Sequence, residues 1–168
     1  MVVILILIAA ASRLLPHPPN FTPVAALGVF GGAMLGRRAA WFVPVGALFA
    51  SDLVLGFYLP VIMFWNYLGL LACVGLGSGL LRARRGPVRI AGGAVASSLV
   101  FFALSNFGMW ASGYYPRTAA GLGRTYAMGL PFLGNTFASD VLFTAALFGG
   151  HALLARLAAR LQARPSAA

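Results

Sequence analysis

Six apolar stretches follow one another along the chain, and the connections between them carry the arginines. The approximate bounds of these stretches are 2–15, 21–35, 39–59, 61–81, 88–111 and 131–154. As helices, the last four are long enough to cross a hydrocarbon core of about 30 Å, and the first two are short for it. Because a backbone in lipid must satisfy its own hydrogen bonds, the pattern predicts an all-α polytopic membrane protein. We expect one domain over residues 1–168, a bundle of six transmembrane helices.

The scarcity of charge supports this class. Only 8% of the residues are charged and 61% are hydrophobic, whereas a soluble domain carries roughly a quarter charged residues. The net charge of +10 comes from arginines scattered between apolar stretches, not gathered on one polar domain. This scatter excludes a nucleic-acid partner and favours the lipid bilayer.

The arginines alternate in number from one connection to the next. Nine would lie on one side of the membrane: Arg37, Arg38, Arg82, Arg84, Arg85, Arg89, Arg156, Arg160 and Arg164. The other side holds Arg13, Arg117 and Arg124. The positive-inside rule then predicts a bacterial inner (plasma) membrane protein with both termini in the cytoplasm. The outer face would carry residues 13–23, the turn 57–60 and a long connection, 112–130.

The two ends of the chain fit the same topology. Residues 1–12 are apolar and lack both a basic leader and a cleavage pattern, so they predict a first membrane helix rather than a signal peptide. Residues 155–164 place arginines on one helical stripe and leucines on another. This pattern predicts an amphipathic tail that extends the sixth helix into the cytoplasmic interface.

Two outer connections stand out. Residues 13–23 contain four prolines, which cannot all lie in one regular helix, so a stiff extended crossing with polar side chains is expected. It could be a binding loop or a plain rigid hairpin. Residues 112–126 are longer than a hairpin needs and carry Tyr114, Tyr115 and Tyr126. These tyrosines fit either a functional loop or an aromatic belt at the membrane interface.

The tetrapeptide Phe-Ala-Ser-Asp occurs twice, and it contains the only two acids, Asp52 and Asp140. Helices of opposite direction would place both carboxylates about 10–14 Å below the outer rim, as an inverted repeat would. Carboxylates at this depth are costly unless they are paired or face a cavity, so they are functional candidates. The alternative is that an outer arginine (Arg13, Arg117 or Arg124) neutralises each one and fixes helix packing.

Other patterns have simpler interpretations. Glycines at spacing four, Gly28, Gly32 and Gly36 in one stretch and Gly75 and Gly79 in another, predict close helix approach inside the bundle. With no lysine the chain has no phosphate-binding loop for ATP, and it has no nucleophile or zinc motif. His17 and His151 lie on opposite sides and cannot share a metal. We therefore expect no metal, no cofactor and no enzymatic activity, and a structural role for the single Cys73.

Several motifs resemble a known family. They are Pro-His-Pro-Pro-Asn-Phe-Thr-Pro-Val-Ala-Ala-Leu (16–27), Ser-Asp-Leu-x-x-Gly (51–56), Phe-Phe-x-x-x-Asn-Phe-x-x-Trp (101–110), Tyr-Pro-x-Thr-x-x-Gly-Leu (115–122) and Pro-Phe-x-x-Asn (131–135). The chain resembles uncharacterised bacterial inner-membrane proteins assigned to transport. That family is in turn similar to the S components of energy-coupling-factor (ECF) vitamin transporters, cobalamin-transporting members included. The resemblance implies an S-component-like, outward-loaded binding subunit that works with an ECF-type transmembrane and ATPase module.

The sequence thus predicts a membrane transport protein that captures a small, vitamin-like solute from the outer face. Aromatic side chains would stack on the solute, Asn and Asp would orient it and Arg would meet an anionic group. The predicted substrate-binding residues are Arg13, His17, Asn20, Asp52, Trp65, Asn106, Trp110, Tyr115, Arg117, Tyr126, Asn135 and Asp140. Two other classes stay open: a non-transporting membrane scaffold or assembly subunit, and an intramembrane enzyme that uses Asp52 and Asp140 as an acid/base pair.

Overall fold

The computed structural model describes residues 2–162, with side chains placed from residue 6, and within this range it is helical without strands. The elements are α1 (Val2–Leu14), α2 (Val24–Met34), α3 (Arg37–Leu55), α4 (Pro60–Leu76), the π-helical turn η1 (Gly77–Leu81), α5 (Pro87–Ala111) and α6 (Ala119–Gln162). Four of the helical segments, 37–55, 60–81, 87–111 and 119–162, are long and apolar enough to cross a membrane, and α2 is a shorter apolar helix. The all-α prediction is confirmed, and several long apolar helices of this kind are compatible with a multi-pass membrane protein.

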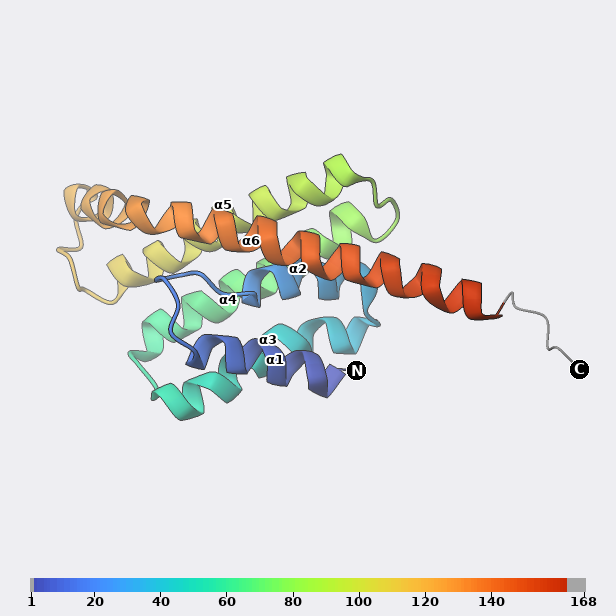
Figure 1. The fold of residues 1–168 in the computed structure, drawn as a ribbon. Coiled ribbons are helices and arrows are strands. Elements are labelled where there is room, and N and C mark those ends of the chain that lie inside the picture. Colours follow the sequence, from blue (N-terminus) through green and yellow to red (C-terminus); the bar gives the residue numbers. More distant parts are fainter. Residues whose placement is uncertain (1, 163–168) are drawn as a thin grey trace, which may run out of the picture.

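The helices run side by side with alternating direction, so the connections gather at two ends (Figure 1). Segments 15–23, 56–59 and 112–118 lie together at one end, on the left in Figure 1, which we call the pocket end. Segments 35–36 and 82–86 lie at the opposite end. This is the division between the two sets of connections that the alternation of apolar stretches predicts.

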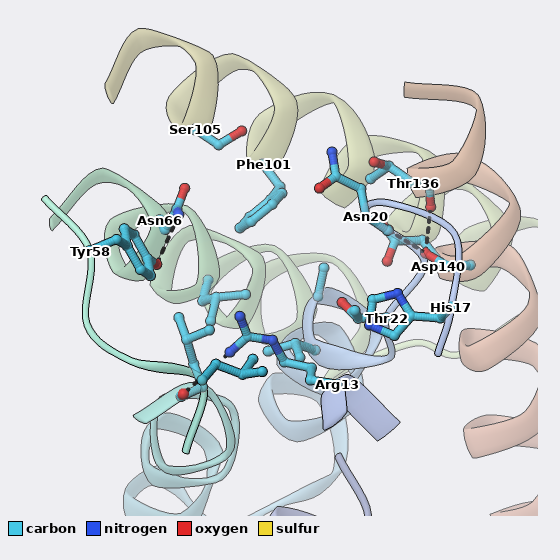
Figure 2. Close-up of a pocket in the computed structure, with 16 residues that line it drawn as sticks. Arg13, His17, Asn20, Thr22, Tyr58, Asn66, Phe101, Ser105, Thr136 and Asp140 are labelled. Atoms are coloured by element: carbon cyan, nitrogen blue, oxygen red, sulfur yellow. Dashed lines mark hydrogen bonds between the residues drawn. The ribbon is translucent and has the colours of Figure 1, made fainter. Parts of the chain in front are cut away.

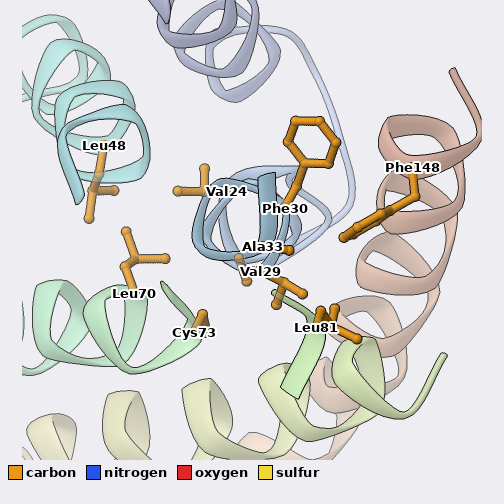
Figure 3. Packing of buried hydrophobic residues seen from close by; sticks show 10 residues of the cluster. Val24, Val29, Phe30, Ala33, Leu48, Leu70, Cys73, Leu81 and Phe148 are labelled. Atoms are coloured by element: carbon orange, nitrogen blue, oxygen red, sulfur yellow. The ribbon is translucent and has the colours of Figure 1, made fainter. Parts of the chain in front are cut away.

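The short helix α2 is the centre of the bundle. Residues 24–33 are all buried, and α2 contacts α3, α4, η1, α5 and α6. Figure 3 shows Phe30 of α2 facing Phe148 of α6, with ring centroids 5.2 Å apart in an edge-to-face arrangement. Because every face of α2 meets another helix, its side chains must be small or fully apolar, which is what its sequence provides.

Glycines let α2 and the α4–η1 segment approach closely. A Cβ added at Gly28 would stand 3.0 Å from the Cβ of Cys73, and one at Gly32 would stand 2.8 Å from the backbone nitrogen of Ser78. Both glycines therefore pack internally, as predicted. The predicted partners Gly75 and Gly79, and also Gly36, face open space instead. Gly77 is the glycine of the second segment that meets α2, against the backbone of Val29.

Local signals explain where several helices begin and end. Pro60 and Pro87 each stand in the first turn of a helix, where the missing N–H costs nothing. At the end of α2, Arg82 donates from Nε to the carbonyl oxygen of Gly32 (3.3 Å) and from Nη2 to that of Leu35 (2.6 Å). The arginine thereby satisfies carbonyl groups that have no partner within their own helix.

Helix α6 differs most from the prediction, because it begins at Ala119 and not near residue 131. The connection is therefore 112–118 and not 112–130. Thr118 caps the helix: its Oγ1 accepts a hydrogen bond from the backbone N–H of Gly121 (3.1 Å). The glycines that made 119–130 resemble a loop instead allow close contacts, Gly121 with the backbone of Pro116 and Gly129 with Asn106. Pro131 lies inside the helix, as membrane helices tolerate.

The C-terminal part of α6 continues past the bundle (Figure 1). At 1.5 Å per residue the helix of 44 residues is about 66 Å long, and residues 149–162 are exposed. The predicted tail 155–164 is thus a continuation of α6 as far as Gln162. Arg164 lies outside the described residues. The remaining helix ends agree with the predicted bounds to within a few residues, the largest differences being at 21–24 and 55–59.

Candidate functional site

A polar cavity lies at the pocket end, inside an otherwise apolar bundle. Its volume is about 250 Å³, and we call it the inner cavity. Figure 2 shows side chains from all sides of the bundle turned toward it. Its lining residues come from α1, segment 15–23, α2, α3, the α3–α4 connection, α4, α5 and α6, and the polar ones are Arg13, His17, Asn20, Thr22, Tyr58, Asn66, Ser105, Thr136, Ser139 and Asp140.

A second cavity of about 470 Å³, the rim cavity, adjoins the first. Asn20, Asn66 and Ser105 line both. The other residues of the rim cavity come from segment 15–23, the α5–α6 connection and the facing parts of α4, α5 and α6: Pro19, Ile62, Asn106, Met109, Tyr114, Tyr115, Thr125, Met128, Gly129 and Phe132. The two cavities together extend from the connection 112–118 toward the middle of the bundle.

Segment 15–23 is fastened to α6, and this holds Asn20 between the two cavities. Asn135 Nδ2 donates to the carbonyl oxygen of Pro19 (3.0 Å), and Ser139 Oγ donates to that of Asn20 (3.5 Å). Asn20 has a φ of 63°, a left-handed conformation that Asn adopts more readily than most residues. The stiff crossing predicted from the prolines is therefore a fixed wall shared by both cavities.

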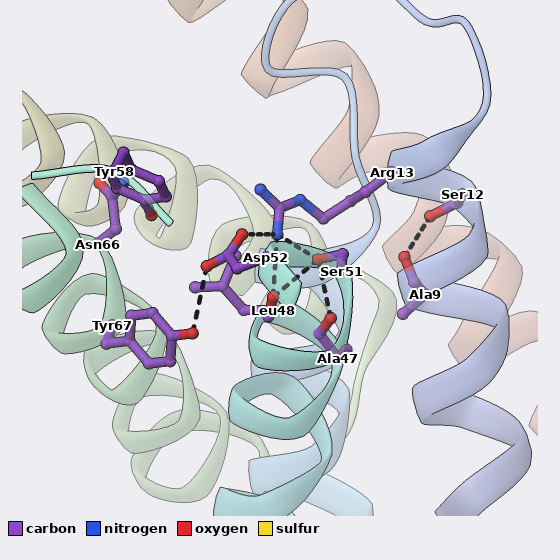
Figure 4. A network of polar contacts seen from close by, with 10 residues as sticks. All are labelled: Ala9, Ser12, Arg13, Ala47, Leu48, Ser51, Asp52, Tyr58, Asn66 and Tyr67. Atoms are coloured by element: carbon purple, nitrogen blue, oxygen red, sulfur yellow. Dashed lines mark hydrogen bonds and ion pairs between the residues drawn. The ribbon is translucent and has the colours of Figure 1, made fainter. Parts of the chain in front are cut away.

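Arg13 and Asp52 form an ion pair beside the inner cavity. Arg13 Nη1 lies 2.9 Å from Asp52 Oδ1, and it also donates to Ser51 Oγ and to the carbonyl oxygen of Leu48 (3.3 Å) (Figure 4). Tyr67 Oη donates to the other carboxylate oxygen of Asp52 (3.2 Å). Arg13 lines the cavity, whereas Asp52 is 1% exposed and stands behind it. Asp52 thus orients Arg13 and neutralises it.

Asp140 has different surroundings. It is also 1% exposed, but it lines the inner cavity directly. Ser98 Oγ donates to its Oδ2 at 2.6 Å. Within the described part of the chain the structure places no arginine or histidine in an ion pair with it. Asp140 therefore contributes a negative charge that the surrounding protein does not balance.

Tyr58 and Asn66 form the wall near the α3–α4 connection. Asn66 Nδ2 donates to Tyr58 Oη at 3.0 Å (Figure 2). Burial raises the pKa of the Tyr58 phenol above its ordinary value, more than the hydrogen bond from Asn66 lowers it. The hydroxyl therefore stays protonated at physiological pH and keeps a proton to donate.

The structure brings half of the predicted site residues to the cavities. Arg13, His17, Asn20 and Asp140 line the inner cavity, and Asn20, Asn106 and Tyr115 line the rim cavity. The other six do not line either one: Asp52, Trp65, Trp110, Arg117, Tyr126 and Asn135. Asp52 and Asn135 hold a lining residue and a lining segment in place, as described above.

The remaining four stabilise the structure around the rim. The ring of Trp65 stands 4.6 Å from that of Phe107, centroid to centroid, and Trp110 packs on the same Phe107 at 5.2 Å. Arg117 donates to the carbonyl oxygen of Ala111 (3.0 Å) and closes the α5–α6 connection. Tyr126 Oη donates to the carbonyl oxygen of Ala103 (2.7 Å).

Several lining residues were not predicted from the sequence. They are Thr22, Tyr58, Asn66, Phe101, Ser105, Thr136 and Ser139 in the inner cavity. Phe101 and Ser105 are four residues apart, as are Thr136 and Asp140, so each pair shares one helix face. That spacing was visible in the sequence. Which face of α5 or α6 turns toward the cavity depends on how the helices pack.

The model of a family of unknown function, DUF6580, matches residues 1–163 of the chain. No curated protein and no solved structure matches it.

Proposed function

The chain belongs to the DUF6580 family, and we propose that it is a membrane transport protein that captures a small solute from the outer side of a bacterial inner membrane. One observation carries the proposal: two adjoining polar cavities lie at one end of an apolar bundle, closed off by a segment fastened to α6. A cavity with a few convergent polar groups in an apolar surround is the usual form of a small-molecule site.

The distribution of arginines supports an outward-facing pocket end. Arg13, Arg117 and Arg124 belong to this end, whereas Arg37, Arg38 and the group 82–89 belong to the opposite end. By the positive-inside rule the opposite end is cytoplasmic, and both termini are with it. In this orientation the solute enters past segment 112–118 and segment 15–23.

The solute must be moved by an energy source. The resemblance to S components points to an ECF-type transmembrane and ATPase module as partner, and the absence of a phosphate-binding loop agrees with an external ATPase. Proton movement at Asp140 is the alternative. In either case the chain itself is the binding subunit, with a vitamin-sized solute as its cargo.

Two rival functions fit the geometry less well. A scaffold subunit predicts an ion-paired interior and glycine-rich faces turned toward a partner; the Arg13–Asp52 pair agrees, but Gly28, Gly32 and Gly77 are used inside the bundle. An acid/base enzyme needs both aspartates in one site. Asp52 stands behind Arg13, and only Asp140 lines the cavity.

Cysteine labelling tests the orientation and the access to the cavity. Cys73 is fully buried, so the native chain should stay unlabelled by a membrane-impermeant maleimide. Ser105→Cys places a thiol between both cavities and should be labelled in intact spheroplasts. Arg84→Cys, at the exposed opposite end, should be labelled only after permeabilisation. The reverse pattern contradicts the orientation, and a silent Ser105→Cys contradicts an open cavity.

Native mass spectrometry tests the capture of a solute. Gently solubilised protein should carry a small molecule, and Ser105→Trp, which fills the junction of the two cavities, should lose it. Leu99→Trp is the matched control, because this residue of α5 is 47% exposed and lines neither cavity. Both variants should elute as monodisperse protein. A solute retained equally by Ser105→Trp, or never found with the native chain, contradicts the proposal.

A further inference from the structure

The two Phe-Ala-Ser-Asp copies adopt similar local structures. In each, the serine hydroxyl donates to a carbonyl one turn earlier in its own helix: Ser51 to Leu48 (2.8 Å) and Ser139 to Thr136 (3.0 Å). In each, the aspartate that follows is 1% exposed. The copies therefore present the same group at the same depth of burial, once from α3 and once from α6.

The copies differ in the charge that meets the carboxylate. Asp52 receives the guanidinium of Arg13 and the hydroxyl of Tyr67. Asp140 receives the hydroxyl of Ser98, and no cation among the described residues pairs with it. A hydroxyl supplies a hydrogen bond but no compensating charge. A buried carboxylate without a cation is unfavourable in a membrane protein unless something in the adjoining cavity supplies one.

The cavity beside Asp140 is otherwise close to electrically neutral. Arg13 and Asp52 cancel each other, and His17 is the other titratable cation-forming side chain of the lining. Asp140 and Arg13 reach the cavity from different helices (Figure 2). The recorded hydrogen bonds of Arg13 all use Nη1, so its second terminal nitrogen, which points away from Ser51 in Figure 4, remains as a donor.

We propose that the captured solute is a small organic cation, with a protonated nitrogen that binds Asp140 as the Arg13 guanidinium binds Asp52. A hydrogen-bond acceptor elsewhere on the solute meets the free donor of Arg13. The volume of about 250 Å³ limits the solute to a small molecule, and Phe101 provides a flat apolar wall for a ring. This inference rests on the proposed function, because it names the chemistry of the solute that the cavity captures.

Three probes that share one ring and differ in charge test the inference: benzylammonium, benzyl alcohol and benzoate, titrated into the purified full chain in nanodiscs by calorimetry. Benzylammonium should bind more tightly than the other two. Asp140→Asn keeps the size of the side chain and an acceptor for Ser98, and should weaken benzylammonium by roughly 10- to 100-fold. Asp140→Glu keeps the charge and should keep the order of the three probes.

The other outcomes separate this inference from the proposed function. Equal binding of the three probes, preference for benzoate, or no binding of any of them overturns the organic cation. A sodium chloride titration distinguishes an inorganic source of charge: binding of sodium that depends on Asp140, without binding of benzylammonium, also overturns it. If Ser105→Trp still loses a copurified solute in any of these cases, capture stands and only the chemistry of the solute is wrong.

Discussion

Asp52→Asn should lower the free energy of unfolding by about 3 kcal/mol, whereas Asp140→Asn should change it by less than about 1 kcal/mol. Removing the Asp52 carboxylate leaves the Arg13 guanidinium, 18% exposed, without its counter-charge. Breaking a buried pair costs about 3–5 kcal/mol, and the partial exposure of Arg13 favours the lower value. At Asp140 no ion pair is lost, and the new amide oxygen still accepts from Ser98. Unfolding in mixed detergent micelles measures both changes.

The double variant Arg13→Gln, Asp52→Asn is the control for this comparison. With both charges removed, no unpaired ion remains, so the double variant should be more stable than Asp52→Asn alone. Such recovery is specific to a charge pair, and a mere packing defect would add to the loss. A loss of stability at Asp140→Asn as large as that at Asp52→Asn would contradict the assignment of Asp140 as a residue without a cation in the protein.

Gly77→Ala should lower the free energy of unfolding by about 3 kcal/mol, the upper part of the range for overpacking. The new Cβ would overlap the carbonyl oxygen of Val29 and stand 2.8 Å from its carbonyl carbon. The obstacle is the backbone of the central helix α2, which cannot rotate away as a side chain could. Thermal unfolding in detergent should show a lower midpoint for this variant than for the native chain.

Gly75→Ala is the matched control two residues away. Nothing lies within 4 Å of a Cβ at Gly75, so the substitution meets no obstacle. Alanine is favoured over glycine inside a helix by about 0.5–1 kcal/mol, so this variant should be as stable as the native chain or slightly more stable. Equal losses at both positions would mean that the crossing of α2 with α4 and η1 is less close than described.

Much of the fold was predictable from the alternation of apolar stretches. Hydrophobicity along the chain indicated helical membrane segments, and prolines such as Pro60 and Pro87 marked their beginnings. The start of α6 was not predicted, because three glycines in 119–130 resembled a loop. The signal that opposed this interpretation was Thr118, a residue favoured at helix N-termini.

The candidate site was predictable only in part. The sequence drew attention to Arg13, Asn20 and Asp140 because polar residues are rare in this chain, and all three line the inner cavity. Tyr58 and Ser105 line it as well, but nothing in their sequence neighbourhood distinguishes them from residues that face lipid. Conversely, the aromatic residues Trp65 and Trp110 were predicted in the pocket and instead pack on Phe107.

The two aspartates show the division most clearly. The sequence by itself determined that both carboxylates are buried among apolar helices, since this depends only on which residues precede and follow each one. Only the tertiary structure decided that Arg13 pairs with Asp52 and that Asp140 faces the cavity. The pairing depends on how α1 and α3 are rotated against each other, and that rotation is set by the packing of both around the glycine-rich helix α2.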